Sequence, residues 1–445
     1  MSITEGEVDD AIFAELHPPL PKQDAIVEAN RCLFCFDAPC TQACPTHIDV
    51  PRFIKKITTG NLRGSALTIL DSNILGASCS RVCPVEVLCE GACVMHRYNK
   101  KPIEIGLLQR HAMDHFYDAG AKLPVPALRP GLARVACIGG GPASLACAAE
   151  LRMRGFDVTV FEAREWPGGL NTHGVAEYKL RAPDSLREVK FIESLGVEVK
   201  TGMRIGEIFQ LEDLEREFGA IFIGSGLGPT EKMNIPGEDL HGVLDAVSYI
   251  GYYKLTRTGP IGRRVVVIGG GNTAIDAAIA AKMLGSGEVY MVYRRGEPEM
   301  PAFNFEYEHA KKMGINFLWQ TAPVAIHGAE NGYVKGLECV RTRMGEPDAT
   351  GRSTPENAEG TNFQIPCDFV IVALGQSKLT KLLADKNIEF ASGCVKTTGR
   401  SGQTTNPKYF AGGDCVSGGR EVVDAVAEGK RAGVGIAKYL ENRNG

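Results

Sequence analysis

The sequence has no apolar run that approaches the ~20 residues needed for a membrane-spanning helix. It also lacks a charge excess of one sign, because 49 Lys and Arg nearly balance 53 Asp and Glu. The formal charge of −4 argues against binding to nucleic acid or to an anionic membrane. The acidic N-terminus contains no signal-peptide core. We therefore expect a cytoplasmic protein, and its 445 residues are enough for about three domains.

Cysteine, by contrast, is abundant, and eight of the 14 cysteines lie between residues 32 and 93. A cytoplasmic chain keeps its thiols reduced, so this clustering indicates metal binding or redox chemistry rather than disulfides. The spacings are Cys32-x2-Cys35-x4-Cys40-x3-Cys44 and Cys79-x3-Cys83-x5-Cys89-x3-Cys93, with proline after Cys44 and Cys83. The first block is similar to a ferredoxin run with a longer middle spacer, and eight thiols could hold two 4Fe–4S clusters. Structural zinc is the alternative, but only one pair has the Cys-x2-Cys spacing of a zinc knuckle.

A glycine-rich turn follows the strand-like run that starts at Arg134. Its first glycine permits a tight turn, its second lets a pyrophosphate approach the backbone, and its last position needs a small residue for packing. Glu162 ends the next strand, where a carboxylate would hold a ribose hydroxyl. The pattern predicts a dinucleotide site that comprises Gly139, Gly140, Gly141, Pro142, Ala143, Ser144 and Glu162.

The same arrangement returns at Gly269, after the run Arg264-Val-Val-Val-Ile. Here the next strand ends in Arg294 and Arg295 instead of an acid, and a guanidinium suits the 2′-phosphate of NADP, so we favour NADPH over NADH. A further strand, which begins at Phe369, ends in a glycine segment. The second predicted dinucleotide site comprises Gly270, Gly271, Asn272, Thr273, Arg294, Arg295, Ala373, Leu374 and Gly375.

Near the C-terminus, the run Phe410-Ala-Gly-Gly-Asp414 precedes a helix that starts around Glu421. Asp414 would hold a ribityl hydroxyl, and the start of the helix, at Val422, would face the flavin ring. Two dinucleotide modules in one chain are what hydride passage from a nicotinamide to a flavin requires. No Cys-x-x-Cys occurs in these modules, so the residues for a redox disulfide beside the flavin are missing. No catalytic nucleophile–base pair is evident.

This order of motifs resembles the small subunit of glutamate synthase and the electron-input half of dihydropyrimidine dehydrogenase, including its bacterial form on a separate subunit. The resemblance runs from about Ala25 to the C-terminus. It implies that Gly169 and Leu170 lie along an FAD and that Lys179 is the basic residue near the flavin. The segment from Leu170 to Lys179 departs from the commoner version, in which Ile-Pro precedes the aromatic residue.

The resemblance also implies the ligands of two 4Fe–4S clusters. Gln109 lies sixteen residues past Cys93, as in the pyrimidine branch, whereas the glutamate synthase branch tends to carry a glutamate there. Cys79 then has no ligand role. The implied sets are Cys32, Cys35, Cys40 and Cys93 for one cluster, and Cys44, Cys83, Cys89 and Gln109 for the other.

The expected fold class is α/β, with an N-terminal α-helical domain for the two clusters followed by two Rossmann-like domains, the NAD(P) domain being inserted into the FAD domain. We place the iron–sulfur domain at residues 1–120, a linker at 121–131, the FAD domain at 132–235 and 376–445, and the NAD(P) domain at 236–375.

The expected function is the electron-input subunit of a dihydropyrimidine dehydrogenase, an NAD(P)-dependent oxidoreductase of pyrimidine catabolism. Hydride would pass from NAD(P)H to FAD, and single electrons would pass through the clusters to a partner. That partner would be a large subunit with FMN and iron–sulfur clusters that carries the uracil or thymine site. The alternatives are a glutamate synthase small subunit, a diaphorase-type module that serves a ferredoxin or another acceptor, and a zinc-structured protein without redox activity.

Overall fold

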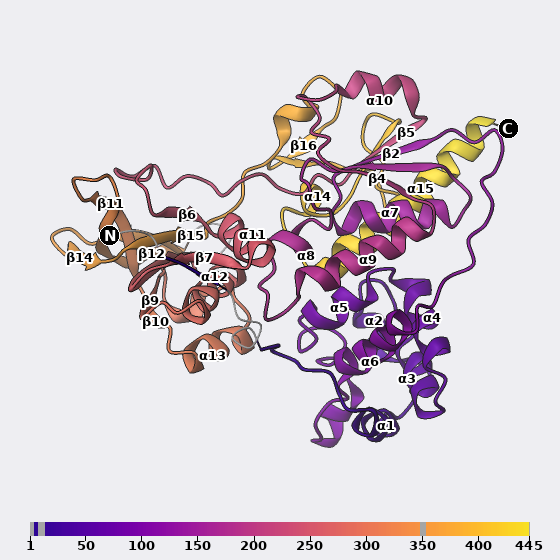
Figure 1. Ribbon diagram of the computed structural model, residues 1–445, viewed down its shortest axis with the longest axis horizontal. Coiled ribbons are helices and arrows are strands. Elements are labelled where there is room, and N and C mark those ends of the chain that lie inside the picture. The colour runs from indigo at the N-terminus through magenta and orange to yellow at the C-terminus, as the bar shows by residue number, and fades with distance from the viewer. Residues whose placement is uncertain (1–3, 8–13, 348–352, 445) are drawn as a thin grey trace. The chain divides into compact units, whose positions relative to one another are not determined.

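A computed structural model of the chain describes residues 4–7, 14–347 and 353–444 (Figure 1). The chain forms two compact units. Unit 1 comprises residues 1–15, 173–178 and 228–377, and unit 2 comprises residues 16–172, 179–227 and 378–445. No helix of the described part is both long and apolar enough to cross a membrane.

The first part of unit 2 is helical, and its short helices share one apolar core that includes Phe53, Ile54, Leu108 and Phe116. Asp49 and Asn61 begin two of these helices, because each side chain accepts a hydrogen bond from a backbone N–H of the first turn. The helices are α1 (Lys22–Asn30), α2 (Pro39–Ala43), α3 (Val50–Thr58), α4 (Leu62–Ser72), α5 (Gly76–Val82), the 3-10 helix η1 (Val94–Tyr98) and α6 (Ile105–Asp118).

The rest of unit 2 is built on a parallel sheet in the order β18-β5-β2-β3-β4. The central strand, β2, is buried on both faces, because Val135 and Cys137 pack in one apolar core while Ala136 and Ile138 pack in another. Its elements are β2 (Val135–Ile138), α7 (Pro142–Arg152), β3 (Val158–Phe161), α8 (Leu170–His173), α9 (Ala182–Ser194), β4 (Glu198–Lys200), α10 (Leu211–Glu217), β5 (Ala220–Ile223), η3 (Thr380–Leu383), β16 (Phe390–Ala391), β17 (Cys394–Val395), β18 (Tyr409–Ala411), α14 (Asp414–Ser417) and α15 (Val422–Asn444).

Unit 1 contains a second parallel sheet, in the order β10-β9-β8-β15-β6, and an antiparallel sheet formed by β11, β12, β13 and β14. Its elements are β1 (Thr4–Glu7), β6 (Val243–Asp245), α11 (Ala246–Thr256), β7 (Thr258–Ile261), β8 (Arg264–Ile268), α12 (Asn272–Met283), β9 (Glu288–Val292), η2 (Glu297–Glu299), α13 (Asn304–Lys312), β10 (Asn316–Leu318), β11 (Thr321–Gly328), β12 (Val334–Pro347), β13 (Ser353–Asn357), β14 (Phe363–Pro366) and β15 (Phe369–Val372).

The expected fold class is confirmed: a helical, cysteine-rich region precedes two Rossmann-like sheets, and one sheet is inserted in the sequence of the other. The helices of residues 22–118 belong to the same compact unit as the first sheet. α5 packs against α9 and α15, and Leu75 lies in the core of the first sheet. The domain boundaries given above stay predictions.

Candidate cofactor sites

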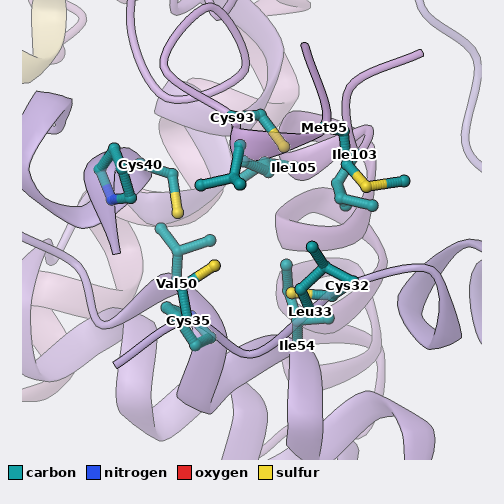
Figure 2. A pocket seen from close by; sticks show the side chains of 13 residues that line it. Cys32, Leu33, Cys35, Cys40, Val50, Ile54, Cys93, Met95, Ile103 and Ile105 are labelled. Atoms are coloured by element: carbon teal, nitrogen blue, oxygen red, sulfur yellow. The ribbon is translucent and has the colours of Figure 1, made fainter. Parts of the chain in front are cut away.

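Four of the clustered cysteines surround one hollow in the helical region. Cys32 and Cys35 lie in the loop after α1, Cys40 lies in α2, and Cys93 immediately precedes η1. Figure 2 shows their side chains approaching the hollow from different sides. The hollow has a volume of about 370 Å³, part of it open to solvent, and its other walls are mostly apolar: Val50, Ile54, Met95, Ile103 and Ile105. The four residues are those that the family resemblance implies for one cluster.

The chemistry of this hollow fits an iron–sulfur cluster. All four donors are thiols, and burial raises the pKa of the Cys40 thiol to about 12. Iron would therefore have to displace a tightly held proton when a thiolate ligand forms. Within the described residues, no three His, Cys, Asp or Glu side chains are placed to share one metal ion. A single zinc ion needs its thiolates close together, whereas a 4Fe–4S cluster occupies the space between them. Sulfurs spread around a hollow therefore suit the cluster better than they suit zinc.

A second group of cysteines, Cys79, Cys83 and Cys89, lies on α5 and the loop that follows it. Contact with the Cys79 thiol and burial raise the pKa of the Cys83 thiol well above its usual range, and Cys89 and Cys44 add to this shift. Gln109 on α6 is buried, and its Nε2 donates to the carbonyl oxygen of Gly76 at 2.7 Å. Thus Cys79 contacts Cys83, and Gln109 contacts the first residue of α5. Whether Cys79 or Gln109 binds iron stays a prediction.

Two substitutions separate these possibilities. With Gln109 as a ligand, Gln109→Ala should alter the spectrum of one cluster or release its iron, whereas Cys79→Ser should leave both clusters intact. NADPH-to-dye activity should survive in both variants, because the dye takes electrons from the flavin. Iron analysis and electron paramagnetic resonance (EPR) spectra measure the outcome. If Cys79→Ser destroys a cluster and Gln109→Ala does not, the ligands are eight cysteines.

The first glycine-rich turn lies at the carboxyl ends of β2 and β5, where open α/β sheets bind ligands. Gly139 has φ +89°, and a Cβ there would come within 2.6 Å of the carbonyl oxygen of Gly224. Gly141 differs, because its backbone is extended (φ −84°) and a Cβ would meet only the Cα of Gly169, at 3.8 Å. An open space, here called a cradle, therefore lies beside the backbone of Gly141 at the start of α7, and a Cβ would occupy it.

Other predicted flavin residues lie around this turn. The N–H of Gly168 donates to the carbonyl oxygen of Gly140 at 2.8 Å, which places Gly169 and Leu170 beside it. A Cβ on Gly413 would lie 2.9 Å from Cβ of Ala143, so Gly413 packs closely against α7. Asp414 is the next residue in the chain. The side chain of Ser144 is buried beneath Gly224, as a small residue at this position should be.

The predicted flavin residues Glu162, Asp414 and Lys179 interact with other groups of the protein. Glu162 accepts hydrogen bonds from the N–H groups of Gly140, at 2.6 Å, and Arg164, at 2.7 Å. Asp414 accepts one from the N–H of Arg420 at 3.1 Å, and burial raises its pKa. Burial also raises the pKa of Glu421, and the positive charge of Lys179 opposes that shift, so Lys179 lies near the start of α15 at Val422. Glu162 follows β3 and Asp414 follows β18 shortly after their ends, so both lie at the carboxyl end of the parallel sheet.

The second turn repeats the geometry within unit 1. Gly269 has φ +144°, and a Cβ there would meet the carbonyl oxygen of Ala373 at 2.4 Å. Ala373 therefore lies against the turn, and a role of residues 373–375 in cofactor binding stays a prediction. Gly271 is extended (φ −91°), and a Cβ there would meet no atom within 4 Å. Thr273 follows in the first turn of α12, and Asn272 Oδ1 accepts a hydrogen bond from the N–H of Phe303 at 3.0 Å.

The two arginines after β9 differ in their surroundings. Arg294 is exposed, whereas Arg295 is buried, and Nε of Arg295 has no hydrogen-bond partner within the described residues. A charge-assisted hydrogen bond to a 2′-phosphate contributes about 1.5–3 kcal/mol, so Arg294→Ala should weaken NADPH binding roughly 10–100-fold and leave NADH nearly unchanged. Fluorescence titration with both cofactors measures this, with Arg295→Ala as a parallel variant. Equal losses for both cofactors would contradict a role in 2′-phosphate binding.

The sequence patterns do not single out Glu188, which is one of several buried carboxylates. Glu188 of α9 is 1% exposed and accepts hydrogen bonds from the N–H groups of Ala77 and Ser78 in α5, at 2.9 and 3.0 Å. Burial raises its pKa to about 7, although these donors oppose the shift. More than a hundred residues separate the partners in sequence, so no local pattern indicates the contact.

Comparison with known proteins gives two family matches and several relatives of full length. Residues 9–121 match the family described as dihydropyrimidine dehydrogenase domain II, 4Fe–4S cluster, and residues 133–429 match the pyridine nucleotide-disulphide oxidoreductase family. The glutamate synthase (NADPH) small chain of Halomonas elongata is 37% identical over 96% of this chain and 93% of its own length. That of Escherichia coli K12 is 34% identical over 96% and 94%.

Solved structures share the fold. Mycobacterium tuberculosis FprA in complex with NADPH superposes with a TM-score of 0.58 at 20% identity, over 70% of this chain and 85% of that one. The relatives named above are glutamate synthase small chains and do not support the narrower assignment to dihydropyrimidine dehydrogenase. The chain belongs to the glutamate synthase small-subunit-like family of NAD(P)-dependent flavin and iron–sulfur oxidoreductases.

Proposed function

We propose that this chain is the electron-input subunit of a two-subunit enzyme and delivers electrons from NADPH to a partner polypeptide. The observation that carries the proposal is the combination, in one chain, of two glycine cradles and a four-cysteine hollow. When bound, FAD supplies the conversion of a two-electron hydride into the single electrons that 4Fe–4S clusters accept. The NADPH-dependent names of the relatives support this electron donor.

The residues of the chain have separable tasks in this function. The cradle beside Gly141 admits the FAD pyrophosphate, and that beside Gly271 admits NADPH. The thiols around the hollow hold one cluster near the surface, since Leu33 and Phe36 of the same loop are 53% and 101% exposed. Large apolar side chains in such a position support electron exit to a docked partner at this loop.

Two partners are supported by different observations. Similarity over nearly the whole chain to glutamate synthase small chains supports a glutamate synthase large subunit. Gln109, buried on α6 at the position of a cluster ligand in the pyrimidine branch, supports a uracil- or thymine-reducing subunit.

Reconstitution tests the function and separates the partners. The purified chain alone should oxidise NADPH with an artificial dye and should reduce neither substrate class. Addition of the correct large subunit should produce either NADPH-dependent glutamate or 5,6-dihydrouracil. Reduction of uracil by the chain alone would contradict the two-subunit proposal. Transfer only to a ferredoxin would assign the chain as a diaphorase-type module.

A further inference from the structure

The buried carboxylate of Glu188 joins the flavin-type sheet to the helical region of the same unit. Besides the two N–H groups of α5, the Ser78 hydroxyl also donates to it. All three donors come from Ala77 and Ser78, so one side chain of α9 fixes the first turn of α5. A carboxylate that receives several hydrogen bonds in a buried place sets the position of the backbone that donates them.

α5 in turn holds residues of the second cysteine group. The carbonyl oxygen of Gly76, its first residue, accepts the hydrogen bond from Nε2 of Gln109, and Cys83 follows directly after its last residue. Gly76 is closely packed, because a Cβ there would lie 2.6 Å from Cγ2 of Ile69. A shift of α5 would therefore move both the side-chain amide of Gln109 and the backbone of Cys83.

α9 also contacts the other end of α5. The guanidinium of Arg81 is nearly buried and forms ion pairs with Asp114 of α6 at 2.7 Å and with Asp184 of α9 at 3.8 Å. Glu188 and Asp184 thus contact the two ends of α5 from a single helix. This arrangement leaves α5 little freedom to shift along α9.

We propose that Glu188 is a positioning residue for the second iron–sulfur site, and that it orients the Gln109 amide through α5 and the Gly76 carbonyl. The bond from Nε2 to Gly76 engages an amide hydrogen and leaves the amide oxygen as the group that can donate to iron. The inference rests on the proposed function, and it adds that a residue outside the cysteine motif tunes one cluster from within the flavin module.

Glu188→Gln tests this with little change in size. An amide offers one acceptor oxygen and turns an NH2 group toward the N–H donors of α5. We expect the EPR spectrum and midpoint potential of one cluster to shift and those of the other to stay unchanged. Iron content and the rate of NADPH-to-dye reduction should remain as in the wild type. Ser78→Ala removes one of the three donors and keeps both N–H donors, so it should shift the same cluster in the same direction but by less than Glu188→Gln.

Wild-type cluster spectra in Glu188→Gln would overturn the proposal. Glu188→Asp, which keeps the charge but shortens the side chain, should shift the same cluster. If both variants fail to fold, as judged by circular dichroism, Glu188 is a structural residue only and the proposal is also overturned. Failure of the proposed function would instead appear in the wild-type protein, as an absence of iron and sulfide before any substitution is made.

Discussion

Gly141→Ala should yield a folded protein that binds FAD poorly. The backbone at Gly141 is extended, which any residue adopts, and the added Cβ would meet no protein atom closer than 3.8 Å. The methyl group would instead occupy the space that a pyrophosphate needs beside the backbone. Overpacking of this kind costs about 1–3 kcal/mol, or roughly 5–150-fold in Kd. Flavin absorbance after purification and fluorescence titration of the flavin-free protein measure the effect.

Two further glycine variants serve as controls. Gly271→Ala makes the same change at the second turn and should weaken NADPH binding while the protein keeps its flavin. Gly139→Ala should instead destabilise the fold, because φ is +89° and the Cβ would collide with the backbone at Gly224. Unchanged FAD affinity in Gly141→Ala would show that the pyrophosphate binds elsewhere.

Cys93→Ser should remove one cluster and abolish partner-dependent turnover. Cys93 is one of four thiols around the hollow, and a hydroxyl is a much poorer iron ligand than a thiolate. Iron and labile sulfide should fall from about eight to about four per chain. NADPH-to-dye reduction should persist, because the glycine cradles are untouched. Metal analysis and the two activity assays measure these outcomes on one preparation.

The control is Cys394→Ser, which replaces a half-buried thiol of β17, away from the cysteine motif. It should retain about eight irons and full transfer to the partner. Two results would contradict the iron–sulfur assignment and favour the zinc-structured alternative. The wild-type protein would contain zinc instead of iron, and Cys93→Ser would retain the same zinc content.

Much of the fold follows from local patterns in the sequence. The run from Arg134 and the run Arg264-Val-Val-Val-Ile form the central strands β2 and β8, and each glycine turn follows its strand. Such turns are predictable because a strand, a tight turn and a helix are all encoded within about thirty consecutive residues. The four cysteines around the hollow were grouped by family resemblance, since spacing alone cannot show how a distant cysteine such as Cys93 joins three earlier ones.

Long-range contacts between side chains were not predictable. Nothing near Glu188 in the sequence indicates that its partners are Ala77 and Ser78, because the contact depends on how α9 packs on α5. Similarly, Arg294 and Arg295 look equivalent in the sequence, yet one is exposed and the other is buried. Burial depends on the surrounding sheet and cannot be derived from a dipeptide.

Anaerobic reductive titration of the wild-type protein tests the central claim most directly. The claim is that one chain joins an FAD to two 4Fe–4S clusters. Titration with dithionite, followed by visible absorbance and EPR, should consume about four electrons per chain: two for the flavin and one for each cluster. Consumption of about two electrons, with flavin bleaching and no cluster signal, would contradict the account.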